Sequence, residues 1–336
     1  MTKQTLKGLA VLIACLGLAL NAYPSMAQNK LVGPRGRLLP HAAQLANKLA
    51  ERFAPEQHTP GSPMVVDFGT LDFPATSDSA GYDVNDKGQF TGGYGPDLEV
   101  SISDTGFFLS NDAFKKINFP GATQTAAFGL NNTGEVVGSY YDTAGNEHGF
   151  SLVSGVYTTI DVPGAILTQV EGVNDSGEIV GLYYNSDPGV GYSFYLEGGT
   201  FTTIAVAGAE DTFAGGVNNS GTIVGQWVDA AGIYHGFSWT SGVFTTIDYP
   251  GAVFSSVLGI NDQGDVAGEY GNGDLDQFAG LQHGFVYGKG QYLGVDVPFV
   301  GSAVTWLDGI NKDGQISGFY VDSAGRFYGF MAKVIP

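Results

Sequence analysis

Three histidines recur in the phrase His-Gly-Phe, and their imidazole groups could bind a metal ion or transfer protons. They are His148, His235 and His283. A second recurrent group is an aspartate in a closing phrase such as Ile-Asp-Val-Pro-Gly-Ala, found at Asp72, Asp161, Asp248 and Asp296. Two carboxylates at a suitable distance could act as acid and base on a glycosidic bond. Whether such chemistry is available depends on where the fold places these repeated residues.

A third phrase, of the type Asn-Asp-Ser-Gly, occurs six times and indicates a periodic architecture. Its asparagines are separated by 46, 43, 44, 43 and 50 residues, at Asn85, Asn131, Asn174, Asn218, Asn261 and Asn311. A period in this range is typical of a repeated supersecondary unit. One copy, residues 123–165, contains four short apolar runs separated by turn-forming residues. Four strands of about six residues with their turns account for that length. The sequence therefore predicts an all-β fold, a six-bladed β-propeller of four-stranded blades.

The two ends of the repeat region predict how the propeller ring closes. The sixth copy stops at Pro336 after its third strand, whereas residues 70–75 supply a closing phrase before the first copy begins. A strand at residues 66–74 can therefore complete the last blade, which leaves no open edge between the chain ends. The propeller then occupies residues 64–336, with repeats at about 76–122, 123–165, 166–209, 210–252, 253–301 and 302–336.

Residues 1–27 have the pattern of a secretory signal peptide. Lys3 and Lys7 precede an apolar run at residues 9–20, and small residues precede the expected cleavage point after Ala27. The apolar run is too short to span a membrane. We therefore expect a secreted or periplasmic protein that is not inserted in the membrane after cleavage.

Removal of the signal peptide would change the composition of the chain. It would leave 12 basic against 33 acidic residues, a net charge of −21. This charge argues against nucleic acid and anionic lipid as partners, because both require a positive surface. The single cysteine, Cys15, would leave with the leader. An acylated Cys15 would instead mark a lipoprotein, but the sequence stays apolar beyond it.

Residues 28–63 are less regular than the repeats. Pro40 could begin a short amphipathic helix whose apolar face would consist of Ala42, Leu45, Leu49 and Phe53. Prolines and a glycine at the end of the segment indicate a linker. The helix could pack on the propeller or bind a partner, and the sequence leaves both possibilities open.

The Asn-Asp-x-Gly phrase has a structural and a calcium interpretation. An Asn or Asp side chain can bond the backbone within a tight turn, and Gly accepts the positive φ that such turns require. Residues 83–88 resemble the start of a calcium loop, but Lys87 stands where an oxygen ligand is needed and no bidentate Glu follows. We therefore expect turns between the first two strands of each blade, and neither a metal site nor a cofactor.

The repeated phrases together resemble the bacterial extracellular HAF repeats. The resemblance rests on the three His-Gly-Phe copies and their association with Asn-Asp-x-Gly and Ile-Asp-Val-Pro-Gly-Ala. It covers residues 66–335, and Thr105, Tyr192 and Tyr328 replace the histidine in the other copies. Membership would imply an exported repeat protein and would assign no catalytic residues.

In a propeller, neither the repeated histidines nor the repeated aspartates would converge on one site. The histidines would lie on third strands, and equivalent points of different blades would be more than about 10 Å apart. Zinc–nitrogen bonds are only about 2.1 Å long, so one shared metal ion is excluded. We expect the histidines to pack and hydrogen-bond between blades. The aspartates would occupy similar environments, and we interpret them as parts of turns.

Residues that differ between copies are better candidates for a binding site. The loops joining strands two and three are enlarged at residues 95–104 and 271–282, on the face that also carries the connections between blades. Aromatic and polar residues together suit a sugar or peptide surface. The candidate ligand-binding residues are Phe213, Trp306, Asp274, Asp276, Gln277, Phe278, Glu210 and Asp211. Ordinary variation of loop sequences is the alternative interpretation.

Two functions follow from these observations. The first is a monomeric, non-catalytic exported propeller that binds a glycan, a cell-envelope component or a protein, and we favour it. The alternative is a secreted polysaccharide hydrolase or lyase with acidic residues near the axis, at Glu171 and Asp308. These two occupy equivalent positions in separate blades, and nothing in the sequence pairs them. An enzyme predicts convergent carboxylates in a deep central pocket, whereas a binding protein predicts a broad aromatic face.

Overall fold

The computed structural model describes residues 64–70, 78–95, 105–111, 113–185, 190–271, 282–298, 304–322 and 325–335. The predicted signal peptide at residues 1–27 and the segment at residues 28–63 lie outside the described residues. Within the described ranges, no helix has the length and hydropathy needed to span a membrane.

The described residues form strands that follow one another in groups of four. Blade 1 consists of β2 (Asp78–Val84), β3 (Phe90–Gly95), β4 (Thr105–Ser110) and β5 (Ala113–Ile117). Blade 2 consists of β6 (Gln124–Leu130), β7 (Val136–Tyr141), β8 (Glu147–Val153) and β9 (Val156–Ile160). Blade 3 consists of β10 (Leu167–Val173), β11 (Ile179–Tyr184), β12 (Gly191–Glu197) and β13 (Thr200–Ile204). Blade 4 consists of β14 (Asp211–Val217), β15 (Ile223–Val228), β16 (Tyr234–Thr240) and β17 (Val243–Thr246). Blade 5 consists of β18 (Phe254–Ile260), β19 (Val266–Gly271), β20 (Gln282–Gly288) and β21 (Gln291–Val295). Blade 6 consists of β22 (Val304–Ile310), β23 (Gln315–Val321), β24 (Phe327–Ile335) and, from the other end of the chain, β1 (Met64–Thr70).

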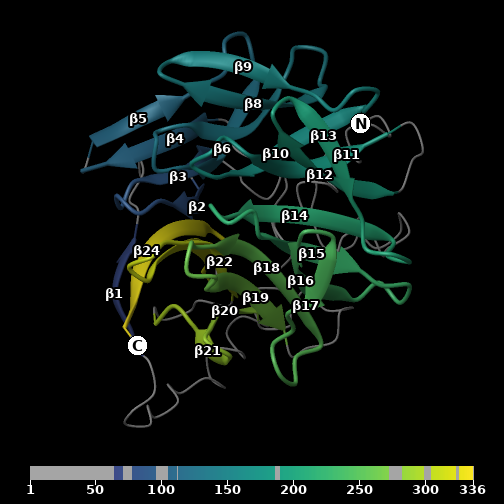
Figure 1. Ribbon diagram of the computed structural model, residues 1–336. Coiled ribbons are helices and arrows are strands. Elements are labelled where there is room, and N and C mark those ends of the chain that lie inside the picture. Colours follow the sequence, from purple (N-terminus) through teal and green to yellow (C-terminus); the bar gives the residue numbers. More distant parts are fainter. Residues whose placement is uncertain are drawn as a thin grey trace.

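The six meanders of antiparallel strands form a propeller, as the sequence predicts. Blades 1 to 4 are separate four-stranded sheets, whereas blades 5 and 6 are joined into one eight-stranded sheet. The joint is a single parallel pair between Gln282 of β20 and Val304 of β22. Each half of the eight-stranded sheet retains its own four-strand order, so counting meanders gives six blades. Figure 1 shows the outer strands β5, β9, β17 and β21 at the perimeter of this arrangement.

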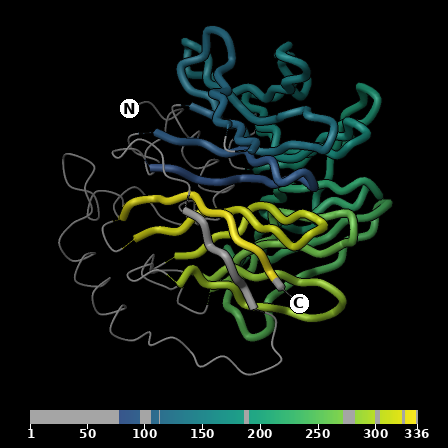
Figure 2. The backbone as a smooth tube through the Cα atoms, turned by 90° about the vertical axis from the view of Figure 1, so that its left-hand side faces the viewer, coloured from purple at the N-terminus to yellow at the C-terminus, as the bar shows by residue number. Residues whose placement is uncertain are grey.

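The ring closes because β1 completes the sixth blade. It pairs with β24 in antiparallel register from Met64 opposite Ile335 to Thr70 opposite Phe330, with an irregularity between Val66 and Gly69. β1 is therefore the outermost strand of blade 6, although most of the chain separates it from β24 (Figure 1). Figure 2 shows the yellow strands of blade 6 directly beside the purple strands of blade 1. This confirms the predicted closing strand for residues 66–70, whereas residues 71–74 of the prediction lie outside the described residues.

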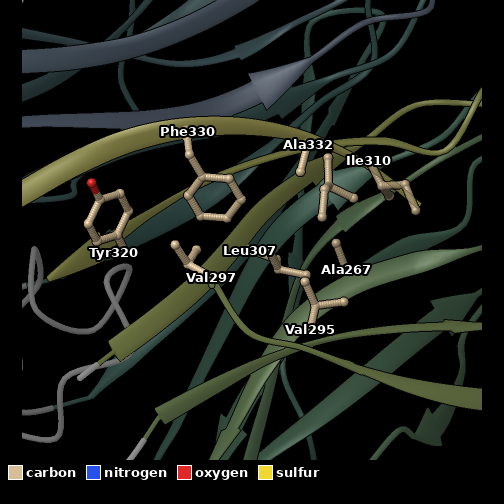
Figure 3. Packing of buried hydrophobic residues seen from close by; sticks show 9 residues of the cluster. Ala267, Val295, Val297, Leu307, Ile310, Tyr320, Phe330 and Ala332 are labelled. Atoms are coloured by element: carbon tan, nitrogen blue, oxygen red, sulfur yellow. The ribbon is translucent and has the colours of Figure 1, made fainter. Parts of the chain in front are cut away.

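A phenylalanine on the third strand of each blade forms the core between neighbouring blades. The equivalent residues Phe107, Phe150, Phe194, Phe237, Phe285 and Phe330 are all buried. Figure 3 shows one such junction, where Ala267 and Val295 of blade 5 pack near Leu307 and Phe330 of blade 6. The glycine of the His-Gly-Phe phrase is needed because the next blade approaches closely. A Cβ atom at Gly149 would lie 2.5 Å from the side chain of Val170.

Each Asn-Asp-x-Gly phrase forms the predicted turn and is closed by its own asparagine. In blade 3, Asn174 Oδ1 accepts hydrogen bonds from the amides of Ser176 and Glu178, both at 3.0 Å. The amide of Gly177 donates to the Asn174 carbonyl oxygen at 3.0 Å. The glycine at this place has a positive φ in every copy, at Gly88, Gly134, Gly177, Gly221, Gly264 and Gly314.

The same six asparagines also join the blades to one another. Each Nδ2 atom donates to the backbone carbonyl oxygen of the asparagine in the next blade, at 2.9–3.1 Å. The donors run in blade order from Asn85 to Asn311, whose Nδ2 atom donates back to the Asn85 carbonyl. We call this closed set of buried hydrogen bonds the asparagine ring.

Removal of β1 is expected to destabilise the propeller strongly. Deletion of residues 1–70 would leave the ladder hydrogen bonds of β24 unpaired, and each such bond contributes about 1 kcal/mol. We expect a loss of several kcal/mol in the free energy of unfolding, with aggregation through the exposed strand edge. Thermal unfolding and size-exclusion chromatography would measure both effects. Deletion of residues 1–63, which removes no described strand, is the control, and equal melting temperatures of the two truncated chains would contradict the closure.

Candidate functional site

Two predicted aromatic anchors, Phe213 and Trp306, lie inside the protein. They occupy equivalent positions in the first strands of blades 4 and 6, and only 3% and 1% of their surfaces are exposed. Trp306 stands where blade 2 has Ala126, and its ring packs on Phe319 with 5.0 Å between centroids. Neither ring is available to stack on a ligand. The prediction that they form a binding surface is therefore corrected, and both are core residues.

The predicted acidic residues beside Phe213 differ in their surroundings. Glu210 is exposed, whereas Asp211 is half-buried and accepts a hydrogen bond from the amide of Gly191 in blade 3. Burial raises the pKa of Asp211 above its usual value. Asp211 therefore fastens the start of β14 to β12, which is a structural role.

The remaining predicted residues lie in the enlarged loop of blade 5. Asp274, Asp276, Gln277 and Phe278 lie outside the described residues, as do residues 96–104 of the blade 1 loop. At the border of the blade 5 loop, Gln282 Oε1 accepts a hydrogen bond from Trp306 Nε1 at 2.5 Å. This end of the loop is thus attached to the core.

The structure brings Glu171 and Asp308 together at the propeller axis. Every first strand contains a β-bulge, and these two acids are the bulged residues of blades 3 and 6. A bulge re-aims the side chain that it carries. Here the bulged residues line a cavity of about 70 Å³ whose walls come from the first strands of all six blades. Asp83 of blade 1, which the sequence pattern does not mark as an axial acid, also lines this cavity.

The three axial carboxyl groups influence one another. Burial raises the pKa of Asp308 well above its usual value, and the nearby carboxylates of Glu171 and Asp83 raise it further. Burial also raises the pKa of Asp83, to about 6, against the effect of hydrogen bonds from the amides of Leu130 and Val84. These donors lie 3.0 and 2.7 Å from the Asp83 carboxylate oxygens.

The axial cavity is too small to hold a polysaccharide. Pockets for small organic ligands typically enclose about 300–1,000 Å³, whereas this cavity has about 70 Å³. The carboxylates converge as the hydrolase alternative requires, but a sugar ring cannot enter between them. A polymeric ligand would have to bind elsewhere.

A different set of polar residues is repeated near the outer end of three blades. His148 Nδ1 lies 2.9 Å from Asp161 Oδ2, His235 Nδ1 lies 2.8 Å from Asp248 Oδ2, and His283 Nδ1 lies 2.9 Å from Asp296 Oδ1. Each pair joins the third strand of a blade to the end of its own fourth strand. The expectation that the histidines bond between blades is therefore wrong, because their partners lie within the same blade.

An aromatic ring from the second strand stacks on each of these imidazoles. The centroid distances are 5.2 Å for Tyr140 and His148, 4.6 Å for Trp227 and His235, and 5.1 Å for Tyr270 and His283. We call these three arrangements the imidazole sites of blades 2, 4 and 5. In blades 3 and 6 a tyrosine replaces the histidine and stacks on the equivalent ring, in the pairs Tyr183–Tyr192 and Tyr320–Tyr328.

A second aspartate faces the other nitrogen of the imidazole in blades 2 and 4. The Nε2 atoms of His148 and His235 lie 3.6 Å from the Oδ2 atoms of Asp142 and Asp229. The amide of Asn146 and its side chain lower the pKa of Asp142 to about 2. Burial raises the pKa of Asp229, but hydrogen bonds from the amides of Ile233 and Ala231 outweigh it, so this pKa is also lowered. Both sites therefore present an ionised carboxylate beside the imidazole at neutral pH.

The imidazole sites are open to solvent to different degrees. The histidine side chains are 27%, 25% and 16% exposed in blades 2, 4 and 5. Trp227 of blade 4 is half-buried, whereas Tyr140 and Tyr270 are buried. Blade 4 thus combines an accessible indole with an accessible imidazole and two carboxylates. A constant separation of thirteen residues between the histidine and its aspartate was the sequence signal that could have identified these pairs.

Comparison with known proteins gives the fold class of this chain. No family model matches it, and no curated protein matches it significantly. AofleA from Arthrobotrys oligospora is 11% identical with a TM-score of 0.50, over 82% of this chain and 88% of that chain. The fungal lectin of Aleuria aurantia, described as a six-bladed β-propeller with a fucose recognition mode, is 12% identical with a TM-score of 0.47, over 79% and 97%. TolB from Acinetobacter baumannii is 10% identical with a TM-score of 0.46, over 77% and 65%. The chain is thus a β-propeller, and the likeness to AofleA shows this fold alone.

A buried acid beside the blade 2 site predicts a pH dependence of stability. Burial raises the pKa of Glu147 to about 7, and the hydrogen bonds from Tyr141 and Ser139 and the charge of His148 oppose only part of this effect. Because the pKa of Glu147 is higher in the folded than in the unfolded chain, the stabilising contribution of its protonated form is fully present below the unfolded-state pKa. This contribution is lost as pH rises through 7. We expect the free energy of unfolding of the native chain to fall by roughly 3 kcal/mol between about pH 4 and pH 8 because of Glu147. The Glu147→Gln variant should not show this loss.

Urea unfolding at several pH values would measure this difference. Glu197→Gln, which changes an exposed carboxylate, is the control and should follow the native chain. If the free energy of unfolding changed with pH in the same way in Glu147→Gln and in the native chain, the prediction would be contradicted, because Glu147 would then ionise in the folded protein without loss of stability.

Proposed function

We propose that the protein is an exported, non-catalytic propeller that binds a glycan through the imidazole sites of blades 2, 4 and 5. The observation that carries the proposal is the repeated combination of a partly exposed imidazole with a stacked aromatic ring and one or two carboxylates, in which the ring itself is accessible in blade 4. The core does not need this combination, since blades 1 and 3 lack both the histidine and its aspartate.

The chemistry of the blade 4 site suits a polyhydroxyl ligand. In the neutral tautomer of His235 that donates its Nδ1 proton to Asp248, the Nε2 atom is a hydrogen-bond acceptor. The gap of 3.6 Å between Nε2 and Asp229 Oδ2 is too long for a direct hydrogen bond between these atoms. Neighbouring hydroxyl groups of one sugar could therefore donate to the imidazole and to the carboxylate, while an apolar face of the sugar packs on Trp227.

Export and repeat-family membership belong to the same proposal. The lysines, apolar run and small residues of positions 1–27 support secretion or release into the periplasm. The HAF-like phrases support an extracellular repeat protein. A binding role at the cell envelope or in the medium agrees with an acidic mature chain, whose negative charge disfavours nucleic acid and anionic lipid as ligands.

A glycan array probed with the chain from residue 28 onward would identify the ligand. Isothermal titration with the corresponding free oligosaccharide should then give three sites per chain. A cationic peptide that binds the carboxylates in place of any glycan would redirect the proposal to a protein partner.

Substitution of Trp227 is expected to remove one of the three sites. Trp227→Ala should lower the stoichiometry from three to two, because a stacking aromatic residue typically contributes about 1–3 kcal/mol. Trp239→Ala is a matched control, since both tryptophans lie in blade 4 and pack on the same apolar cluster. Asp248→Asn should act like Trp227→Ala while keeping the shape of the side chain. Unchanged stoichiometry in both variants, or an equal loss in Trp239→Ala, would contradict the proposal.

A further inference from the structure

The axial cavity takes no part in the proposed glycan binding, and its composition is unusual. Its walls consist of acidic, aromatic, aliphatic and glycine residues, and no Lys, Arg or His of the described chain lines it. Two acids, Glu171 and Asp308, enter from blades on opposite sides of the ring. In the other blades the equivalent bulged residues are uncharged: Tyr82, Phe128, Gly215 and Leu258.

The third acid, Asp83, occupies a position that is glycine in the other five blades. A Cβ atom at Gly129 or Gly259 would lie 2.5 or 2.6 Å from a backbone oxygen of the next blade, so glycine is needed where first strands converge. Blade 1 has Asp83 instead, and its Oδ1 atom would lie only 2.9 Å from a Cβ placed at Gly309. A carboxylate is thus accommodated beside the axis at a position where the rest of the ring excludes any side chain.

Buried carboxylate oxygens of two residues, Asp308 in the cavity lining and Glu269 close to Asp308, lack hydrogen-bond partners. Asp308 Oδ2 has none among the described residues, and the same is true of both carboxylate oxygens of Glu269. Glu269 is fully buried, and the Ser256 hydroxyl lies beside it without hydrogen-bond geometry. Asp308 and Glu269 are close enough to repel one another. A buried carboxylate without a partner is costly, and the usual explanation is a bound water or ion.

The size of the cavity limits which ligand can balance the negative charge of these acids. A water molecule needs at least about 10–15 Å³ of such space, so a cavity of about 70 Å³ holds a few waters or a small ion with part of its hydration shell. The described residues contain no group of three or more His, Cys, Asp or Glu side chains already placed to hold a metal directly. An ion here would therefore keep several water ligands, which is typical of Mg²⁺ bound by one or two carboxylates.

We propose that the axial cavity binds one partly hydrated divalent cation of the Mg²⁺ type, coordinated directly by Glu171 and Asp308 and reached by Asp83 through water ligands of the ion. The ion balances negative charge contributed by three different blades. It therefore acts as an electrostatic link across the centre of the ring, between the asparagine ring and the aromatic core around Trp306.

Metal titration of the mature chain tests this proposal directly. Chain treated with a chelator should bind one Mg²⁺ in isothermal titration and should melt at a higher temperature when Mg²⁺ is added. Asp308→Asn and Glu171→Gln should each weaken Mg²⁺ binding by at least tenfold. Both variants should also melt at a higher temperature than the native chain without metal, because each removes one of the repelling carboxylates.

Glu210→Gln is the control for nonspecific screening of an acidic protein, since Glu210 is exposed and lies away from the cavity lining. Its Mg²⁺ affinity should equal that of the native chain. Parallel titrations with Ca²⁺ and Na⁺ would establish the type of ion. The proposal is overturned if no cation binds saturably, or if Asp308→Asn and Glu171→Gln keep the native affinity.

Discussion

The asparagine ring is the interaction on which the rest of the propeller depends. One side chain performs two tasks: its oxygen closes the turn within a blade, and its nitrogen donates to the turn of the next blade. Both tasks require an amide, because a carboxylate cannot donate and a hydroxyl cannot span both distances. Asn311 donates to Asn85, so the ring joins the last blade to the first in the same way as it joins all the others.

The residue that follows each ring asparagine differs between the six repeats, and its contacts with neighbouring blades explain this variation. Asp and Asn alternate at this position, and Asn219 Nδ2 donates to the carboxylates of both Asp175 and Asp262. In blade 6 the position is Lys312, whose Nζ lies 3.4 Å from Asp86 Oδ2. Adjacent like charges are thereby avoided around the axis, although this surface is exposed. With the fold secured at the turns, residues at the outer ends of the blades and at the axial bulges are free to differ.

The sequence predicted those parts of the structure that follow from periodic patterns. The spacing of the asparagines indicated the number of blades, and the closing phrase before the first copy indicated the role of β1. The direction of individual side chains could not be predicted in the same way. Phe213 and Trp306 lack counterparts in the other repeats and were therefore predicted to lie on the surface, yet both side chains are buried in apolar clusters. Glu171 and Asp308 converge because a bulge turns them toward the axis, and a bulge adds one residue without a distinctive sequence signal.

The most direct test of this account compares two links of the asparagine ring by equilibrium unfolding. Asn218→Ala breaks a link between consecutive blades, and Asn311→Ala breaks the link between the last blade and the first. Each leaves a buried carbonyl oxygen without its donor and should lower the free energy of unfolding by about 1–3 kcal/mol, in one cooperative transition. Similar losses in the two variants are the predicted result. An unchanged unfolding midpoint in either variant would contradict the claim that a closed ring of equivalent bonds holds the blades together.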